Sequence, residues 1–199
     1  MTVNGNIATV SGNSWSCNIS LATNQTHTLN IKATDMAGNE TNIVRYIRVV
    51  PKYLLYESGT SYVNFTTSIY GGSGGTINYN SDHIYVASNP DAVYGLQPYA
   101  ILFTPVLSGY NYKYVNVTYD SWSQSDTTSA SKFAVLNDTS IEQGSTNRSF
   151  ANKVVSKSFS SASGTVQIAW TDGKIIGLGC FSQSNRSCVM KIRKIWFSS

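Results

Sequence analysis

The sequence predicts an all-β protein made of two domains, and its composition is the first reason. Charged residues make up only 12% of the 199 residues, whereas Ser, Thr and Asn together make up a third. Strong helix formers such as Leu, Glu, Lys and Arg are scarce, while Thr, Val, Ile and Tyr are plentiful, which disfavours a helical bundle. Hydrophobic residues reach 41%, so the chain can bury a core and is not intrinsically disordered.

The second reason is periodicity. Apolar and polar side chains alternate in many short runs that are separated by turn-forming residues, as in β-strands. No stretch carries a helical apolar stripe over three turns. No apolar run approaches the roughly 18 residues that a membrane-spanning helix needs.

Residues 1–51 are expected to form the first domain, because four short alternating runs there indicate strands of a β-sandwich. Trp15 and Cys17 fall on the apolar side of one run, and both are expected in the core. Two further runs, over residues 28–33 and 43–50, are joined by a turn.

Three pieces of this segment carry a family resemblance: Val3-Asn4-Gly5, then Trp15-Ser16-Cys17-Asn18-Ile19-Ser20-Leu21, then residues 28–39 with the turn Ala33-Thr34-Asp35-Met36-Ala37-Gly38-Asn39. Their order resembles the later strands of bacterial immunoglobulin-like repeats, in which an Ala-Thr-Asp-x-Ala-Gly-Asn turn follows a Leu-rich strand. Such repeats are longer than this segment. The resemblance therefore implies a partial immunoglobulin-like spacer that lacks its first two strands, and it implies no catalytic residue.

Pro51 marks the expected boundary between the domains, because proline ends a β-ladder and holds the preceding residue extended. The composition changes at the same place, since 12 of the 13 Tyr lie between residues 53 and 119. The second domain is therefore expected over residues 53–199.

The second domain is expected to be a β-jelly-roll sandwich of eight to ten strands. Apolar or alternating runs predict strands at residues 53–56, 62–67, 76–87, 99–103, 114–119, 133–136, 154–159, 165–170, 175–181 and 189–197. Trp170 and Trp196 lie within alternating runs and are expected in the core.

A second resemblance lies in the order of three features: a Gly-rich loop at residues 71–75, the phrase Phe103-Thr104-Pro105-Val106-Leu107-Ser108-Gly109-Tyr110 before a strand, and the closing strand Lys191-Ile192-Arg193-Lys194-Ile195-Trp196-Phe197. This order is similar to galactose-binding-like jelly rolls, the architecture of many carbohydrate-binding modules, as in gut-bacterial surface proteins and phage tail proteins. The resemblance implies a carbohydrate-binding domain and transfers no individual ligand residue.

Cys180 and Cys188 bracket a segment that is expected to fold as a hairpin with residues 183–185 as its loop. In that register the two cysteines face each other, and directly opposed strand residues lie about 4.5–5.5 Å apart, a distance compatible with a disulfide. A disulfide and two free thiols both remain open.

The sequence predicts no enzyme. The two histidines, His27 and His83, lie near no Gly-x-Ser-x-Gly elbow, and they are too few for a zinc site. The acidic residues of the second domain lie mostly in turn-like surroundings, which explain them without a glycosidase carboxylate pair. No cofactor is expected, although Asp120 and Asp126 bracket a stretch whose oxygens could hold a structural calcium ion.

Aromatic residues in loops are the expected ligand-binding groups, because Trp and Tyr rings can stack on the apolar faces of a sugar while Asn, Asp and Gln bind its hydroxyls. The candidates are Trp122 and Asp120 in a polar stretch that predicts a loop, Tyr110 and Tyr112 ahead of a strand, and Tyr70 and Tyr79 on either side of the Gly-rich loop.

The net charge of +4 is spread thinly, and only Lys191, Arg193 and Lys194 cluster, so neither nucleic-acid binding nor membrane insertion is expected. Residues 1–6 lack the basic and apolar regions of a signal peptide, so the chain is expected to be a piece of a longer protein.

Together these features predict a non-catalytic extracellular binding module, at a cell surface or on a virion, that recognises a glycan or cell-surface polysaccharide and is presented on an immunoglobulin-like spacer. Two alternatives remain open. One is a purely structural or assembly protein of a phage tail or bacterial surface fibre, in contact with other subunits. The other is an accessory domain of a larger glycosidase.

Overall fold

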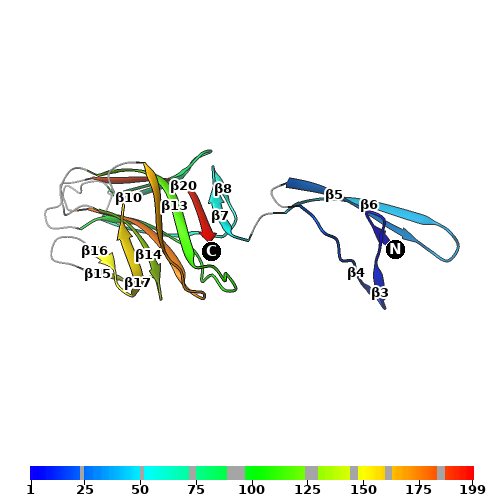
Figure 1. The fold of residues 1–199 in the computed structure, drawn as a ribbon. Helices are drawn as coiled ribbons and strands as arrows, with labels where there is room; N and C mark the ends of the chain where they lie inside the picture. The colour runs from blue at the N-terminus through cyan, green and yellow to red at the C-terminus, as the bar shows by residue number, and fades with distance from the viewer. Residues whose placement is uncertain are drawn as a thin grey trace. The chain divides into compact units, whose positions relative to one another are not determined.

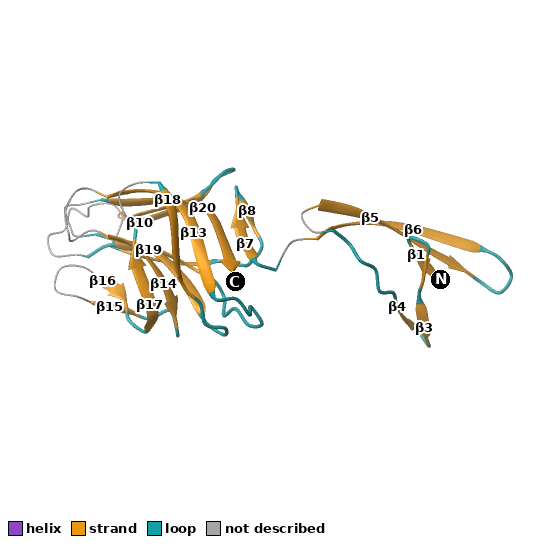
Figure 2. Cartoon of the chain, viewed as in Figure 1, coloured by secondary structure: helices purple, strands orange, loops and turns teal. Residues whose placement is uncertain are grey.

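The computed structural model confirms the all-β class (Figures 1 and 2). It describes residues 1–22, 25–49, 52–71, 75–88, 97–123, 130–143, 148–159, 163–182 and 187–199, with only the backbone of residues 121–123 and 130. None of these residues lies in a helix, and hence none belongs to a helix that could cross a membrane. The chain divides into two compact units, Met1–Pro51 and Lys52–Ser199, and each is described by itself.

The first unit contains a four-stranded antiparallel sheet of order β2-β1-β5-β6 and a separate hairpin, β3-β4. Their bounds are β1 (Thr2–Val3), β2 (Asn6–Ile7), β3 (Thr9–Ser11), β4 (Ser14–Ser16), β5 (Gln25–Thr34) and β6 (Glu40–Val49). The expected turn joins β5 to β6. Its Asp35 carboxylate accepts hydrogen bonds from the N–H groups of Ala37 at 2.9 Å and Asn39 at 2.8 Å. Gly38 supplies the positive φ, +89°, which a side chain would resist.

The core predicted for this unit is wrong in its residues. Among its described residues only Val3 and Ala8 are buried apolar side chains. Trp15 is 45% exposed, and Cys17 is half-buried with its thiol near the carbonyl oxygens of Asn6 and Ile7. The strand predicted to run to Leu21 stops at Ser16. The alternating pattern correctly placed Trp15 in a strand. In the described part of this unit, however, no second layer covers the β3–β4 hairpin, so the Trp15 side chain stays exposed.

The second unit is a sandwich of two antiparallel sheets. The seven-stranded sheet has the order β10-β11-β20-β13-β18, with β7 paired to β20 and β8 paired to β7. Its strands are β7 (Leu54–Glu57), β8 (Thr60–Ser61), β10 (Gly75–Tyr79), β11 (Ile84–Ser88), β13 (Tyr114–Ser123), β18 (Gly164–Ala169) and β20 (Cys188–Ser198).

The five-stranded sheet has the order β17-β14-β19-β12-β9. Its strands are β9 (Thr66–Tyr70), β12 (Tyr99–Phe103), β14 (Ala130–Leu136), β17 (Lys153–Ser158) and β19 (Ile175–Phe181), and a separate hairpin joins β15 (Ile141–Gln143) to β16 (Arg148–Phe150). From β11 to β14, and again from β17 to β20, successive strands alternate between the two sheets. This alternation is the connectivity of a jelly-roll sandwich.

The main core lies between the sheets and is built by strand alternation. In β13, Val115, Val117 and Tyr119 point into it, and in β20 Met190 and Ile192 do the same. A bulge in the β13–β20 ladder between Thr118 and Tyr119 shifts the register, after which Ile195 and Phe197 continue the buried side of β20.

A second cluster covers the outer side of the five-stranded sheet. Phe150 of the β15–β16 hairpin packs on Leu136, Phe103 and Phe181, with a ring-centroid distance of 5.1 Å to Phe181. Gly177 makes room for this ring, because a Cβ there would lie 2.8 Å from Phe150 Cε1. The hairpin therefore closes part of this side of the sandwich.

Two of the strands predicted for the second unit differ from the structure. Residues 62–63 bend, so the strand expected at 62–67 begins only at Thr66. The stretch 76–87 is a hairpin of β10 and β11, not one strand.

Cys180 and Cys188 do not pair across a hairpin, because β19 and β20 belong to different sheets. They still converge inside the core. Their sulfurs lie 3.7 Å and 3.1 Å from Ser131 Oγ, and both are free thiols.

Candidate ligand-binding face

The outer side of the seven-stranded sheet carries polar side chains between its buried ones. In β18, Val166 and Ile168 are buried while Gln167 between them is exposed. The same alternation turns every second residue of β13 and β20 outward. We call the surface formed by Tyr114, Asn116, Gln167, Trp196 and Ser198 the polar face.

A chain of hydrogen bonds runs across the polar face. Gln167 Nε2 donates to Asn116 Oδ1 at 2.9 Å, and Asn116 Nδ2 donates to Ser198 Oγ at 3.0 Å and to the Trp196 carbonyl oxygen at 3.3 Å. Asn116 is only 4% exposed, so the central member of this chain of hydrogen bonds is nearly buried in the protein. Because these bonds fix the amide orientations in advance, a ligand would lose little additional side-chain freedom there.

Two aromatic side chains flank this chain of hydrogen bonds. Tyr114 pairs with Ser198 and Asn116 pairs with Trp196, so Tyr114 and Trp196 are diagonal neighbours on one side of the sheet, about 7–8 Å apart. Tyr114 is 37% exposed and Trp196 is half-buried. Lys194 Nζ lies 5.5 Å from the Trp196 ring centroid.

Charged side chains of β13 and β20 lie on the same side of the seven-stranded sheet, beyond the polar face. Arg193 donates to Asp120 Oδ2 through Nε at 2.9 Å and Nη2 at 2.7 Å, and its Nη1 donates to Asp82. These hydrogen bonds, led by the one to Asp120, raise the pKa of Arg193. Lys194 and Glu57 form a further ion pair at 2.5 Å. The charges are thus largely neutralised within the protein.

The one His–Asp pair among the described residues does not form a catalytic triad. His83 Nδ1 lies 2.6 Å from Asp82 Oδ1, while its Nε2 lies 3.0 Å from Asn80 Nδ2. Both ring nitrogens therefore have partners, and neither faces a nucleophile. The His83 hydrogen bond, followed by Arg193, lowers the pKa of Asp82, whereas a general acid requires a raised carboxyl pKa.

The prediction of a loop around Trp122 is wrong. Trp122 lies in β13, where its backbone pairs with Val189, and its side chain is outside the described part of the chain. Asp120 lies in the same strand and is bound by Arg193. Its predicted calcium partner Asp126 is outside the described residues, within which no three His, Cys, Asp or Glu side chains cluster to hold a metal.

The structure places Tyr110 and Tyr112 in a loop, as expected, but against the core. Their rings lie 5.0 Å and 5.4 Å from that of Phe197, and both are half-buried. Asp172 holds this loop by accepting hydrogen bonds from the N–H groups of Gly109 at 2.9 Å and Tyr110 at 2.8 Å. These two tyrosines therefore have a packing role that does not need a ligand.

Tyr70 and Tyr79 end β9 and β10, on either side of the Gly-rich loop. Tyr70 stacks beside Tyr99 with 5.7 Å between centroids, and the Arg148 guanidinium lies 4.1 Å above its ring. Tyr79 is 54% exposed at the end of an edge strand. The predicted residues are thus dispersed over different parts of the unit rather than gathered at one site.

The central residues of the polar face were not predicted as ligand residues from the sequence. The prediction that Trp196 lies in the core is wrong, because Ile195 and Phe197 on either side of it take the buried positions. Trp170 was placed correctly and is 7% exposed. The signal for the face was present in Tyr114-Val115-Asn116-Val117-Thr118, where polar residues alternate with two buried valines.

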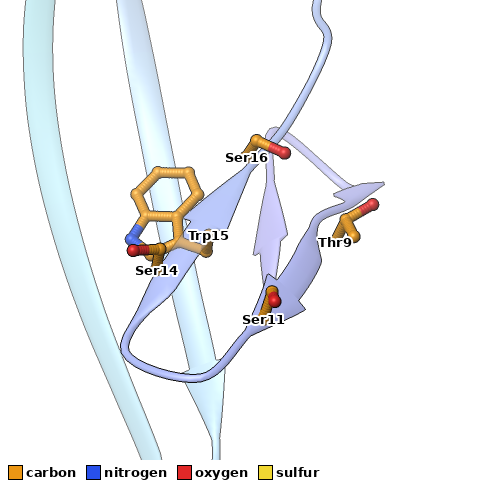
Figure 3. A pocket seen from close by; sticks show the side chains of 5 residues that line it. All are labelled: Thr9, Ser11, Ser14, Trp15 and Ser16. Carbon is orange, nitrogen blue, oxygen red and sulfur yellow. The ribbon is translucent and has the colours of Figure 1, made fainter.

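A small hollow of about 140 Å³ lies on the β3–β4 hairpin of the first unit (Figure 3). It is lined by Thr9, Ser11, Ser14, Trp15 and Ser16. None of these side chains ionises near neutral pH, so the hollow offers no acid–base group for catalysis.

No protein-family model matches the chain, and the search of curated proteins gives no significant match. Among solved structures, the K1 cleaved adhesin domain of Lys-gingipain from Porphyromonas gingivalis is similar at 13% identity and a TM-score of 0.42, over 68% of this chain and 90% of that one. A family 11 carbohydrate-binding module from Clostridium thermocellum, in complex with a β-1,3-1,4-mixed-linked tetrasaccharide, gives 8% identity and a TM-score of 0.43, over 73% and 95%.

The enzymatically active domain of tailspike protein 4 from bacteriophage CBA120 is also similar, at 12% identity and a TM-score of 0.41. That match covers 76% of this chain and 22% of the tailspike chain. Similarity at this level assigns neither a family nor a ligand. The residues of this chain must therefore carry any proposal for its function.

Proposed function

We propose that the chain is a non-catalytic extracellular module that binds a glycan, such as a cell-surface polysaccharide, on the polar face of its second unit. The observation that carries the proposal is the chain of hydrogen bonds from Gln167 through Asn116 to Ser198, next to outward-facing Trp196 and Tyr114. Pyranose rings have apolar C–H faces and ring hydroxyls, so they need both kinds of group within reach.

The position of the site on the outer side of a sheet predicts weak binding. A shallow site with one or two stacked rings and a few hydrogen bonds supports roughly 4–6 kcal/mol, or a Kd between millimolar and tens of micromolar. Neutralised charges at Arg193 and Lys194 favour an uncharged sugar over a strongly acidic one, because neither cation is free of an internal carboxylate partner.

A glycan array probed with the full chain tests the proposal. We expect a limited set of neutral glycans to bind wild-type protein and to be lost with Trp196→Ala. The exposed Val154→Ala serves as the control, because Val154 lies in β17, an edge strand of the other sheet, and is not a candidate ligand residue. Trp122→Ala is included because the sequence predicts that this change abolishes binding. Binding lost with Trp122→Ala and kept with Trp196→Ala would move the site away from the polar face.

A structural or assembly role is the second candidate, and the first unit supplies the observation that favours it. Its described surface exposes Ile7 at 86%, Tyr46 at 74% and Met36 completely. Val44, 46% exposed, lies two residues from Tyr46 on the same side of β6, and such neighbouring exposed apolar side chains favour contact with another protein. Light scattering over a concentration series discriminates the two roles: a stable oligomer together with an empty glycan array supports assembly, as in a tail or surface fibre.

A further inference from the structure

Three small polar side chains meet inside the core near the ends of their strands. Cys180 is the second-last residue of β19, Cys188 is the first of β20, and Ser131 is the second of β14. Cys180 and Cys188 are fully buried, and Ser131 is 2% exposed. The serine hydroxyl lies between the two sulfurs, 3.1 Å from Cys188 Sγ and 3.7 Å from Cys180 Sγ.

The two thiols also interact with each other. A hydrogen bond from Cys180 lowers the pKa of Cys188, whereas burial raises the pKa of Cys180 well above its ordinary value. The contacts give the same order: Cys180 Sγ lies 3.2 Å from the Val86 carbonyl oxygen, a hydrogen bond that needs the thiol proton, whereas Cys188 Sγ lies 3.1 Å from the Ser131 hydroxyl, which can donate to a thiolate. Cys180 is therefore the thiol that keeps its proton, and Cys188 is the one that ionises first. This asymmetry suits thiol–disulfide exchange, in which one thiolate attacks first and the second thiol resolves the mixed disulfide.

We propose that Cys180 and Cys188 are a redox-sensitive pair that closes to a disulfide between the two sheets when the protein meets a low-molecular-weight disulfide such as oxidised glutathione. The Cys188 thiolate attacks the glutathione disulfide, forms a mixed disulfide and releases one glutathione. Cys180 then loses its proton and attacks Cys188 Sγ, which releases the second glutathione. Two protein thiols are oxidised while one glutathione disulfide is reduced to two thiols.

The bond would connect the layers of the sandwich rather than neighbouring strands. β19 belongs to the five-stranded sheet and β20 to the seven-stranded sheet, so the disulfide would span the core. Burial makes the first attack dependent on local opening, and both cysteines lie where strands end, the part of a sheet that opens at the lowest free-energy cost. Closure should therefore proceed in the native state, but slowly.

The experiment incubates the folded full chain in mixtures of oxidised and reduced glutathione, quenches it in acid and measures intact mass and tryptic peptides. Trypsin cleaves after Lys174, Arg186 and Lys191, so closure joins peptides 175–186 and 187–191. We expect a loss of about 2 Da and this joined pair. Cys17 lies in a separate peptide, so any pairing with it is distinguishable.

Matched variants complete the test. Cys17→Ser should close normally, whereas Cys188→Ser should not. Because Cys188→Ser could itself lower stability, each variant is compared with and without oxidant. Closure should raise Tm by roughly 5 °C in wild type and Cys17→Ser and leave Tm of Cys188→Ser unchanged. A stable glutathione adduct without the joined peptides, closure only in denaturant, or two thiols that remain alkylatable would each overturn the proposal.

Discussion

At the level of single residues, hydrogen-bond partners decide which polar groups are available to a ligand. Asp120 looked available in the sequence, but Arg193 binds it twice. Tyr70 is packed between Tyr99 and Arg148. Gln167 is different, because it is exposed and its amide nitrogen is oriented by hydrogen bonds to Asn116 Oδ1 at 2.9 Å and to Ser198 Oγ at 3.5 Å. Such partners come from strands distant in sequence, so no local pattern could predict them.

Gln167→Ala is expected to weaken glycan binding several-fold and to leave the fold intact. The side chain is exposed, so its removal uncovers no core, and the loss of its hydrogen bond to the nearly buried Asn116 costs about 1–3 kcal/mol. Titration calorimetry with a glycan that binds wild type, together with Tm, measures both effects. Unchanged affinity would exclude Gln167 from the site, and a fall in Tm larger than this cost explains would assign it a structural role instead.

Asp172 predicts a pH dependence of stability. The backbone N–H groups of Gly109 and Tyr110 lower its pKa in the folded protein below the unfolded value of roughly 3.9. Between those two pKa values the unfolded state binds more protons, so the stabilisation is present above about pH 4 and is lost as pH falls through the folded pKa. Asp172→Asn should show a shallower loss of unfolding free energy between pH 5 and 3 in urea titrations. A slope equal to that of wild type would contradict this assignment.

At the level of strands and hairpins, the period-two pattern predicted most strands of the two sheets of the sandwich but not the hairpin that covers the outer side of one of them. β12, β19 and β20 were expected close to their observed bounds, because long alternating or apolar runs define them, whereas β13 continues four residues beyond its expected end at Tyr119. The β15–β16 hairpin was not predicted, since its strands are three residues each and carry no period. Its role depends on Phe150 reaching the outer side of the five-stranded sheet, which only the tertiary arrangement reveals.

Phe150→Ala should destabilise the second unit by about 3–5 kcal/mol, the usual cost of removing a fully buried phenylalanine. The cavity would open between Leu136, Phe103 and Phe181. Urea unfolding measures this loss, with Tyr79→Ala as a control that should stay within about 0.5 kcal/mol of wild type. A small effect of Phe150→Ala would mean that the hairpin is not a structural cover.

At the level of the whole molecule, the two units differ in how much core they contain. Apart from Val3 and Ala8, all the buried apolar side chains among the described residues lie in Lys52–Ser199. The sequence predicted a core in both units because period-two alternation looks the same whether or not a second layer covers it. The apolar composition was predictable, but the number of strands and the covering of each face were not, since the described part of the second unit has 14 strands where eight to ten were expected.

A fragment of residues 52–199 is therefore expected to fold alone and to keep the glycan binding of the full chain. Both of its core clusters draw only on its own residues. Thermal unfolding by circular dichroism and the same glycan titration provide the readouts. If the fragment were unfolded, or folded without binding, the first unit would have to contribute directly to the stability or to the site of the second.

The position of the ligand face is the central claim, and a single titration series tests it most directly. A glycan that binds the wild-type chain is titrated into wild type, Trp196→Ala and the control Val154→Ala, and the fold of each variant is checked by its Tm. We predict at least a tenfold loss of affinity, about 1.4 kcal/mol, for a folded Trp196→Ala and no change for Val154→Ala. Wild-type affinity in a folded Trp196→Ala protein would contradict the claim that the polar face binds the glycan.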